Sequence, residues 1–580
     1  MRNQMHSFAA TPDANIPRSR FNMPCNVKFT GNTGKLIPFY VCEVLPGDTF
    51  EVSTSLVCRL QTLIHPLMDN MYLDTYFFFV PNRLVWDNWK HFCGEPNKAW
   101  VPDREWTVPK INLAFIPGNG WTGEDNEAKY KDFLKNGFKD SIVDYMGIGF
   151  NPVIDYAATS WRNYAINALP IRAYNKIYDD WFRDENLIDP INLYTGDSNQ
   201  AMVNKASWQE PLYGGKPYNA PKLHDYFTSA LPEAQRGDPV SLAAGITADR
   251  YVNTIKTRNV DAYKMPGLSI LSNKTGNNSN VTTYELQPVS GNTPKALNVI
   301  DGNPESDTGI FTIRPDNLAF NLSGYNLGIT INDLRMAFQV QKFMERSARG
   351  GARYIELIKS MFGVTSPDAR LQRSEYLGGH RVPINIHQVV NQSESVDSSL
   401  GNTAAFSVTS DVHNDFIHSF TEHGFVIGIC TVRYKHTYPQ GMNRMWSRTT
   451  KFDYYWPVFA NIGEQPIKNK EIFFNQDGVV ADQVFGYQEA WADYRYMPNR
   501  VMGEMRPGIP STLASWHLAD FYEDQPILSQ DWIEEDLAPV DRAIAVTSSV
   551  ADQFLFDVLI NNNATRPMPL YSVPGLVDHF

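Results

Sequence analysis

Short apolar segments bounded by turn residues occur towards both ends of the chain and predict β-strands. Thr49–Val57 alternates apolar and polar residues, which places Phe50, Val52 and, less clearly, Thr54 on one face. Met71–Val80 ends in a run of consecutive apolar residues, a pattern typical of a strand that is buried on both faces. The predicted strands are Leu36–Val44, Thr49–Val57, Met71–Val80, Ala404–Thr409 and Gly424–His436.

Helical patterns lie in the middle of the chain. Pro170 separates two predicted helices and can occupy the first turn of the second. The clearest helical pattern follows Asn332 and Asp333, which are suited to cap a helix, and Gly350-Gly351 interrupts it. The predicted helices are Tyr156–Ala168, Ile171–Asn186, Asp333–Arg349 and Ala352–Met361.

The chain divides into four regions by pattern. Residues 1–35 are polar and aperiodic and predict an extended basic arm, and residues 36–246 hold the first strands with helical insertions. Residues 247–312 are rich in Asn, Gly, Ser and Thr and predict a solvated surface insertion. Residues 313–580 hold a helical insertion, the remaining strands and an acidic C-terminal segment. No internal repeat is present, so the strands near the start of the chain need those near its end to complete a sheet. We therefore predict a single mainly β fold, a β-sandwich with long insertions.

The composition is that of a folded protein with many aromatic side chains. Of the 580 residues, 43% are apolar and 20% charged, which excludes a disordered chain, and the absence of a repeat excludes a fibrous one. Aromatic residues reach 13% and indicate either extensive protein interfaces or a wide aromatic ligand groove. The five scattered cysteines form no Cys-x-x-Cys pair, so we expect neither a disulfide framework nor a zinc knuckle. Without an apolar leader or a long apolar run, we expect a soluble protein made in a cytoplasm.

The net charge of −12 is unevenly distributed. Residues 517–557 carry ten acids and one base, whereas residues 1–35 and 335–381 are both basic. In the predicted helix Asp333–Arg349, four cations fall on one ridge, and a fifth joins them if the helix continues. A ridge of cations suits a nucleic acid backbone, although a solvated face or a subunit contact explains it as well. The candidate DNA-contact residues are Arg335, Lys342, Arg346, Arg349 and Arg353 on this ridge, and Arg2, Arg18 and Arg20 in the arm, where Phe8 and Phe21 could stack on bases.

Two other motifs are better explained as structural features than as catalytic or binding sites. Gly118–Gly123 matches a dinucleotide-binding fingerprint, but no alternation of strands and helices surrounds it, so we interpret it as a glycine-rich loop. His413, His418 and His423 are five residues apart, a spacing that fits neither a helical nor a strand metal site, and we interpret them as loop histidines. We assign no catalytic residues, no metal ligands and no cofactor.

Long strings of the sequence resemble the major capsid proteins of gokushovirus-type microviruses (Microviridae), which are small single-stranded DNA bacteriophages. They include LPIRAYNKIYDDWFRDENL, DLRMAFQVQKFMERSARGGARYIELI, YPQGMNRMWSR and FGYQEAWADYRYMPNRVMGEMR. The segments that carry the resemblance are Pro46–Trp89, Leu169–Leu187, Lys222–Pro239, Ile331–Gly379, Phe425–Trp456 and Phe485–Arg506.

The resemblance implies a fold, an assembly and a set of partners. The fold would be an eight-stranded antiparallel jelly roll with long inserted loops and several helices. Copies of the chain would form a small (T=1) icosahedral virion capsid around circular single-stranded DNA, assembled in the host cytoplasm. A small basic DNA-packaging protein and an internal scaffolding protein would be further partners. The family carries a protrusion at its three-fold axes, which we assign to residues 247–312 as the contact with a receptor on the bacterial host surface.

A β-sandwich that binds or cleaves carbohydrate is the alternative from another functional class. Tryptophans could stack on sugar rings, and Glu489 and Asp493 would be candidate catalytic acids. The candidate stacking residues are Trp86, Trp89, Trp121, Trp161 and Trp491. No motif supports this alternative.

Overall fold

The computed structural model describes most of residues 16–571. The longer stretches outside the description are 96–104, 114–135, 152–164, 202–209, most of 238–330, 366–371 and 393–402. Arg2, Phe8, the Gly118–Gly123 motif, Trp121 and Trp161 therefore lie outside the described residues.

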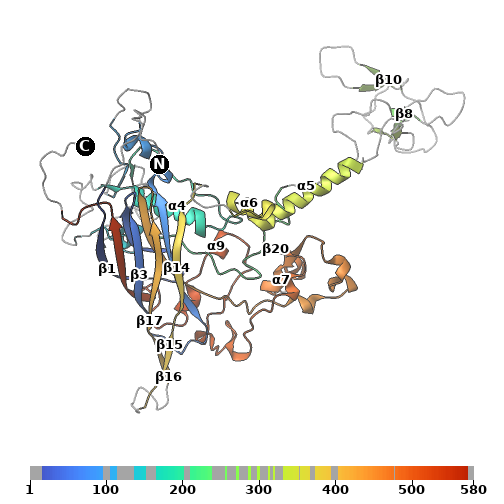
Figure 1. The fold of residues 1–580 in the computed structure, drawn as a ribbon. Helices are drawn as coiled ribbons and strands as arrows, with labels where there is room; N and C mark the ends of the chain where they lie inside the picture. The colour runs from blue at the N-terminus through green and yellow to red at the C-terminus, as the bar shows by residue number, and fades with distance from the viewer. Residues whose placement is uncertain are drawn as a thin grey trace. The chain divides into compact units, whose positions relative to one another are not determined.

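Eight strands form a β-sandwich of two four-stranded antiparallel sheets (Figure 1). One sheet has the order β1 (Ser19–Gly31), β21 (Phe554–Arg566), β3 (Thr49–Leu60), β17 (Thr409–Ser419). The other has the order β14 (Glu375–Pro383), β4 (Met71–Pro81), β18 (Gly424–Tyr434), β2 (Ile37–Val44). Each sheet thus takes two strands from the first 81 residues and two from the last 206, the interleaving that a jelly roll produces. The predicted β-sandwich is confirmed.

Apolar side chains fill the space between the two sheets. Phe50, Val52 and Thr54 of β3 are all buried, as their alternation predicted, and they face residues such as Phe77 of β4. β4 is buried on both faces because its other side packs against the insertion that follows it. That second core joins Phe78 and Ile427 to α4 (Leu169–Ile177).

The helices agree in part with the predicted ones. Pro170 lies in the first turn of α4, as expected, and the helix ends in a π-helical turn, η3 (Tyr178–Phe182), four residues before the predicted end. The predicted helix Tyr156–Ala168 is wrong at its described end, where β6 (Ala165–Asn167) is a strand. α5 (Ile331–Gly350) and α6 (Tyr354–Phe362) confirm the other two helices, with Gly351 between them at a positive φ of 93°.

Residues 19–31 differ from the expected aperiodic arm, because they form β1. This edge strand pairs along its whole length with β21, from Ser19 opposite Arg566 to Gly31 opposite Phe554. Its inward residues, such as Phe21 and Phe29, are only partly buried, although residues 21–29 alternate apolar and polar side chains as a strand does. The first and last strands of the sandwich therefore lie side by side.

The expected surface insertion belongs to a compact unit of its own, Gly237–Met344. Its described strands form three nested antiparallel pairs rather than loops alone: β8 with β13, β9 with β12, and β10 with β11. Their bounds are β8 Ile255–Thr257, β9 Ile270–Ser272, β10 Glu285–Pro288, β11 Leu297–Ile300, β12 Phe311–Ile313 and β13 Leu318–Phe320. Nested pairing brings the two ends of the insertion back together.

Short elements connect the strands elsewhere. A third apolar cluster, with Phe227, Tyr438 and Trp532 among its members, lies where β19 and β20 pair. The short strands are β5 Lys110–Asn112, β7 Gln200–Ala201, β15 Ile386–Val390, β16 Thr403–Ser407, β19 Glu464–Lys468 and β20 Val484–Glu489. The short α-helices are α1 Trp89–Phe92, α3 Ile142–Tyr145, α7 Asn469–Ile472, α8 Gly478–Asp482, α9 Gln530–Ile533 and α10 Ala538–Asp541.

Candidate functional surfaces

Residues 444–462 and 494–513 present many large apolar side chains to solvent, and we call them the aromatic surface. Short 3-10 helices carry them, among them η7 (Arg444–Ser447), η8 (Lys451–Asp453) and η9 (Pro457–Phe459). The exposed side chains include Trp446, Phe452, Tyr454, Trp456, Val458, Met497 and Met502. Exposure of many apolar side chains to water is unfavourable. An apolar surface of this kind therefore indicates contact with another protein.

Buried polar contacts hold the backbone of the aromatic surface in place. Arg448 forms an ion pair with Asp493, and both side chains are almost fully buried. The Arg448 guanidinium also lies 4.2 Å from the centre of the Tyr494 ring. Trp491 donates a hydrogen bond from Nε1 to the carbonyl of Phe459. The exposed side chains therefore project from a rigid support, which lowers the ordering cost of a contact.

Local capping fixes the turns that carry the exposed rings. The Asp453 carboxylate accepts hydrogen bonds from the backbone amides of Thr449 and Thr450 and from the Thr450 hydroxyl. These hydrogen bonds lower the pKa of Asp453 to about 2, so the cap stays charged at any physiological pH. The side chain of Asn443 accepts a hydrogen bond from the Met445 amide in the same way.

A cavity of about 340 Å³ lies beside the aromatic surface. Its lining combines aromatic rings, including Tyr438 and Tyr496, with the guanidinium groups of Arg444, Arg500 and Arg506. Glu471, which also lines the cavity, lies 3.9 Å from Arg444. The lining thus combines aromatic rings and cations with the carboxylates of Glu471 and Asp493.

The five cations of the predicted ridge have different surroundings. Arg335, Lys342 and Arg346 are exposed and form no ion pair with any described residue. Arg349 pairs with Glu464 and lies 3.8 Å from Glu489. Arg353 is largely buried, pairs with Glu185 and Glu356, and donates hydrogen bonds to two backbone carbonyls. Arg349 and Arg353 are therefore ion-paired with carboxylates of the same chain.

The two described cations of the N-terminal region lie on and beside β1. The Arg20 guanidinium pairs with Glu51, with both side chains about half exposed. Arg18 lies against Gly47 in the turn between β2 and β3. Exposed pairs of this kind exchange readily for other partners, because they contribute little to stability.

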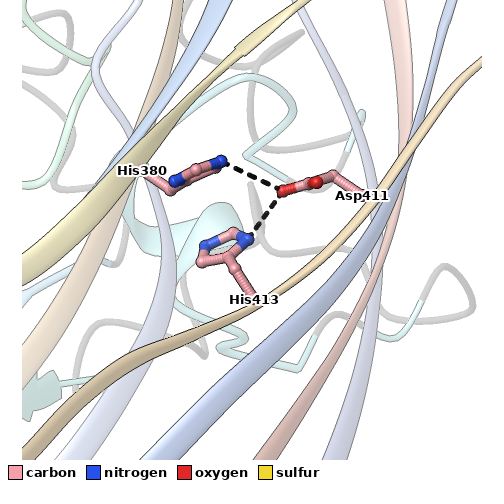
Figure 2. A group of neighbouring side chains, drawn as sticks. All are labelled: His380, Asp411 and His413. Atoms are coloured by element: carbon pink, nitrogen blue, oxygen red, sulfur yellow. Dashed lines mark hydrogen bonds and ion pairs between the residues drawn. The ribbon is translucent and has the colours of Figure 1, made fainter.

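The histidines that we interpreted as loop residues lie partly on a strand. His413 and His418 belong to β17, and His423 alone precedes β18 in the connecting turn. The fold also brings His380 of β14 next to Asp411 and His413 of β17 (Figure 2). The sequence signal for this group was the strand spacing Asp411-x-His413, but its third member, His380, is 31 residues away and is placed by the fold.

Four of the side chains expected for the carbohydrate alternative, Trp86, Trp491, Asp493 and Glu489, are engaged by other residues in the described part of the chain. Trp86 is fully buried and donates a hydrogen bond to Asp197, and Trp491 is buried beneath the aromatic surface. Asp493 is held by Arg448, and Glu489 pairs with Arg495. These residues do not form a sugar-binding platform.

The C-terminal acidic segment is part of the fold. Asp520 and Glu535 are buried on either side of His436, whose Nδ1 lies 2.8 Å from Asp520 and whose Nε2 lies 3.2 Å from Glu535. Burial alone would lower the pKa of His436, but the two carboxylates outweigh it and raise the pKa to about 9. Lys222 lies 3.8 Å from Asp520 and adds a second positive charge.

Comparison with known proteins gives consistent matches over the whole chain. The family model described as "Capsid protein (F protein)" matches residues 9–576. The chain is 38% identical to the capsid protein VP1 of Spiroplasma virus 4, with 99% of this chain and 98% of that protein aligned. It is 37% identical to capsid protein VP1 of Bdellovibrio phage phiMH2K and 36% identical to that of Chlamydia phage 1, again over at least 97% of each chain. Among the described residues, no helix is long and apolar enough to cross a membrane.

Proposed function

This chain belongs to the capsid protein (F protein) family, and from that premise we propose that its copies assemble into a small icosahedral shell around circular single-stranded DNA. The chain is a structural major capsid protein of the gokushovirus type, and it is not an enzyme. The observation that carries the proposal is the match at 36–38% identity over nearly the full length of three capsid proteins. Its place is therefore the virion capsid.

We propose that the aromatic surface is a contact between subunits in this shell. Closed shells need large interfaces on every subunit, and the cores of such interfaces are rich in aromatic residues and Met. The rigid support from Arg448 and Trp491 suits a surface that must fit the same partner many times.

Sedimentation of the purified chain tests the assembly, and one substitution tests the surface. Val458 is 88% exposed, so Val458→Asp should leave the fold intact but place an unpaired charge in the interface. We expect wild-type protein to form particles under assembly conditions and Val458→Asp to remain a monomer of 65.8 kDa, with an unchanged melting temperature. Such a charge costs several kcal/mol per contact, which a repeated interface multiplies.

Val550→Asp is the matched control, because Val550 is 78% exposed and lies outside the aromatic surface. It should assemble like the wild type. Normal particles from Val458→Asp would remove residues 444–462 from the interface. A wild-type chain that remained monomeric under every condition, and showed no particles by negative-stain imaging, would contradict the shell itself.

For the packaged DNA, we propose the N-terminal cations Arg2, Arg18 and Arg20 as contacts. The helical ridge is the weaker set because Arg349 and Arg353 are paired within the chain, and residues up to Met344 belong to the insertion unit. Since that unit is also our proposal for host contact, its cations Arg335 and Lys342 would lie outside the shell. A small basic packaging protein would supply further positive charge inside.

The insertion, residues 247–312 within the unit Gly237–Met344, is proposed as the protrusion that contacts the receptor on the bacterial surface. Its support is its position between the matched strings Lys222–Pro239 and Ile331–Gly379 and its polar composition. An internal scaffolding protein would guide assembly in the host cytoplasm.

A further inference from the structure

We propose that His380, Asp411 and His413 bind one zinc ion at the edge of the sandwich. Figure 2 shows the three side chains directed toward one another from β14 and β17. Asp411 Oδ2 lies 2.8 Å from His413 Nδ1 and 3.5 Å from His380 Nε2. One ligand atom from each residue falls within 4.8 Å of the others, so a small movement places all three about 2 Å from a common centre.

The surroundings of His413 match those of a metal-bound histidine. Its second ring nitrogen, Nε2, lies 2.8 Å from Asp415 Oδ1, and the Asp415 side chain is fully buried. Asp415 in turn accepts a hydrogen bond from the Thr54 hydroxyl on β3. A carboxylate that faces the second nitrogen holds the proton there and leaves Nδ1 free to bind the metal.

Two buried atoms at this point have no hydrogen-bond partner among the described residues. They are His413 Nε2 and Asp415 Oδ1, which lie close together but are not aligned. Unsatisfied buried polar atoms are costly and mark a site that is incomplete. Coordination at Nδ1 would fix the ring and let Nε2–H point at Asp415.

The chain is shaped so that these residues meet. β17 has an irregularity between Asn414 and Phe416, and this β-bulge lets the consecutive residues Asp415 and Phe416 both face inward. Gly378 of β14 lies directly against the backbone carbonyl of Asp415, where a side chain would not fit. This close approach brings His380, two residues further on, over His413, with 4.4 Å between the ring centres.

The site would join the two sheets at their edges. β14 is the edge strand of one sheet and β17 the edge strand of the other. Further along the same seam His418 lies 3.8 Å from Glu375, so polar groups, rather than apolar packing alone, line this edge. A metal bound to the folded chain stabilises it by mass action and would hold the edge of the sandwich closed.

The donor set indicates which metal fits. Two imidazole nitrogens and one carboxylate oxygen suit Zn²⁺, whereas Ca²⁺ and Mg²⁺ prefer oxygen ligands alone. Three protein ligands leave the fourth tetrahedral position for water. The His380 side chain is nearly half exposed, which gives the ion a path from solvent and gives the ring freedom to move onto it.

Zinc binding to the full-length, tag-free chain after EDTA treatment tests the proposal. Calorimetric titration with ZnCl₂ at pH 7.5 should show one equivalent bound and a higher melting temperature, and equal amounts of CaCl₂ or MgCl₂ should not. Cobalt in place of zinc should give the visible absorption bands of tetrahedral Co²⁺. His380→Ala should abolish this binding without unfolding the chain, because His380 is at the surface. Asp415→Asn, which changes only the second partner of His413, should weaken zinc binding by about 10- to 100-fold.

His387→Ala is the matched control, since His387 is an exposed histidine on β15, the strand that follows β14 along the chain. It should bind zinc like the wild type. Three results would each overturn the proposal: no saturable zinc binding, equal zinc binding by His380→Ala and wild type, or a site that prefers Ca²⁺. In each case the cluster would be an ion-paired group in which carboxylates hold a protonated histidine.

Discussion

At the scale of single residues, charged groups are buried where they fix the fold, and apolar groups are exposed where a partner is expected. Asp74 shows the first, because two arginines, Arg381 and Arg433, surround its buried carboxylate. Burial alone would raise the pKa of Asp74, but the hydrogen bonds and charges of the two arginines lower it. Val458 shows the second, in the short helix η9, where the buried Trp491 donates a hydrogen bond to the neighbouring carbonyl of Phe459. The buried charged residues therefore stabilise the single subunit, whereas the exposed apolar residues are available for contacts between subunits.

The buried His436 should make the stability of the subunit depend on pH. The pKa of His436 is raised from about 6.5 in an unfolded chain to about 9 in the fold, between Asp520 and Glu535. A raised pKa stabilises the fold fully below about pH 6.5, and this contribution is lost as the pH rises through about 9. A pKa shift of this size contributes at most about 3 kcal/mol to the free energy of unfolding. We expect His436→Gln to lose more stability at pH 6 than at pH 9.5, measured by urea unfolding of unassembled protein.

His387→Gln is the control for this measurement, since its imidazole is exposed. It should keep the wild-type dependence on pH. An identical slope in wild type and His436→Gln between pH 6 and pH 9.5 would show that other groups carry the dependence.

Local pattern predicted individual buried residues but not pairs that are distant in sequence. The alternation in β3 was enough to place Phe50 and Val52 in the core, because a strand has a period of two whatever its partner. The environment of His413 was not predictable in this way, since His380 and Thr54 reach it from other strands. The same holds for Arg353, whose charge fits a solvent-exposed ridge but whose carboxylate partner Glu185 is distant in the chain.

At the scale of elements, the strongly apolar strands were predicted and the edge strand β1 was missed. β4 and β18 are apolar enough on both faces to be read from sequence alone, because each is covered by a second layer. β1 lies at the edge of its sheet, and the alternation of residues 21–29 signals a strand, but the polar, Pro- and Asn-containing residues around it led to its interpretation as an extended arm. Its partner β21 is at the opposite end of the chain, and only the fold reveals the pairing.

The nested strand pairs of the insertion predict where it can be removed. Thr257 and Leu318 are direct partners in the outermost pair, β8 with β13. Replacing residues 258–317 by an Asn-Gly turn should therefore close a short hairpin and leave the sandwich intact. We expect this variant to assemble into particles of normal appearance by negative-stain imaging. These particles should lose attachment to bacterial cells that bind particles with the complete insertion.

Deletion of residues 255–305 provides the contrast. It removes β8 to β11 and leaves β12 and β13 without their partners, so we expect poorer folding and lower particle yield. If the deletion of 258–317 failed to fold while the less regular deletion folded, the nested pairing would not support the insertion. Undiminished attachment would remove the insertion from host contact.

At the scale of the whole molecule, the net charge of −12 does not indicate how charge is distributed over the surface. Part of the charge of the acidic C-terminal segment is internal, because Asp520 and Glu535 are buried and compensated by His436 and Lys222. Some of the positive charge is internal too, as with Arg172, which is buried among backbone carbonyls. Contact with DNA must therefore be judged from cations that are accessible, and the two sets predicted from the sequence can be compared on that ground.

Salt dependence can decide which of the two sets contacts the genome. Each phosphate contact on single-stranded nucleic acid contributes about 0.7 to the slope of log affinity against log salt. Replacement of all three arm cations, Arg2, Arg18 and Arg20, by Ala should therefore lower the magnitude of this slope by about 2. The slope is obtained from oligonucleotide affinities measured at several NaCl concentrations. The same change at Arg335, Lys342 and Arg346, which form no ion pair with described residues, is the matched variant and should leave the slope unchanged. A lower slope from the helix set alone would transfer the contact to α5, and no change from either would leave DNA binding to the packaging protein.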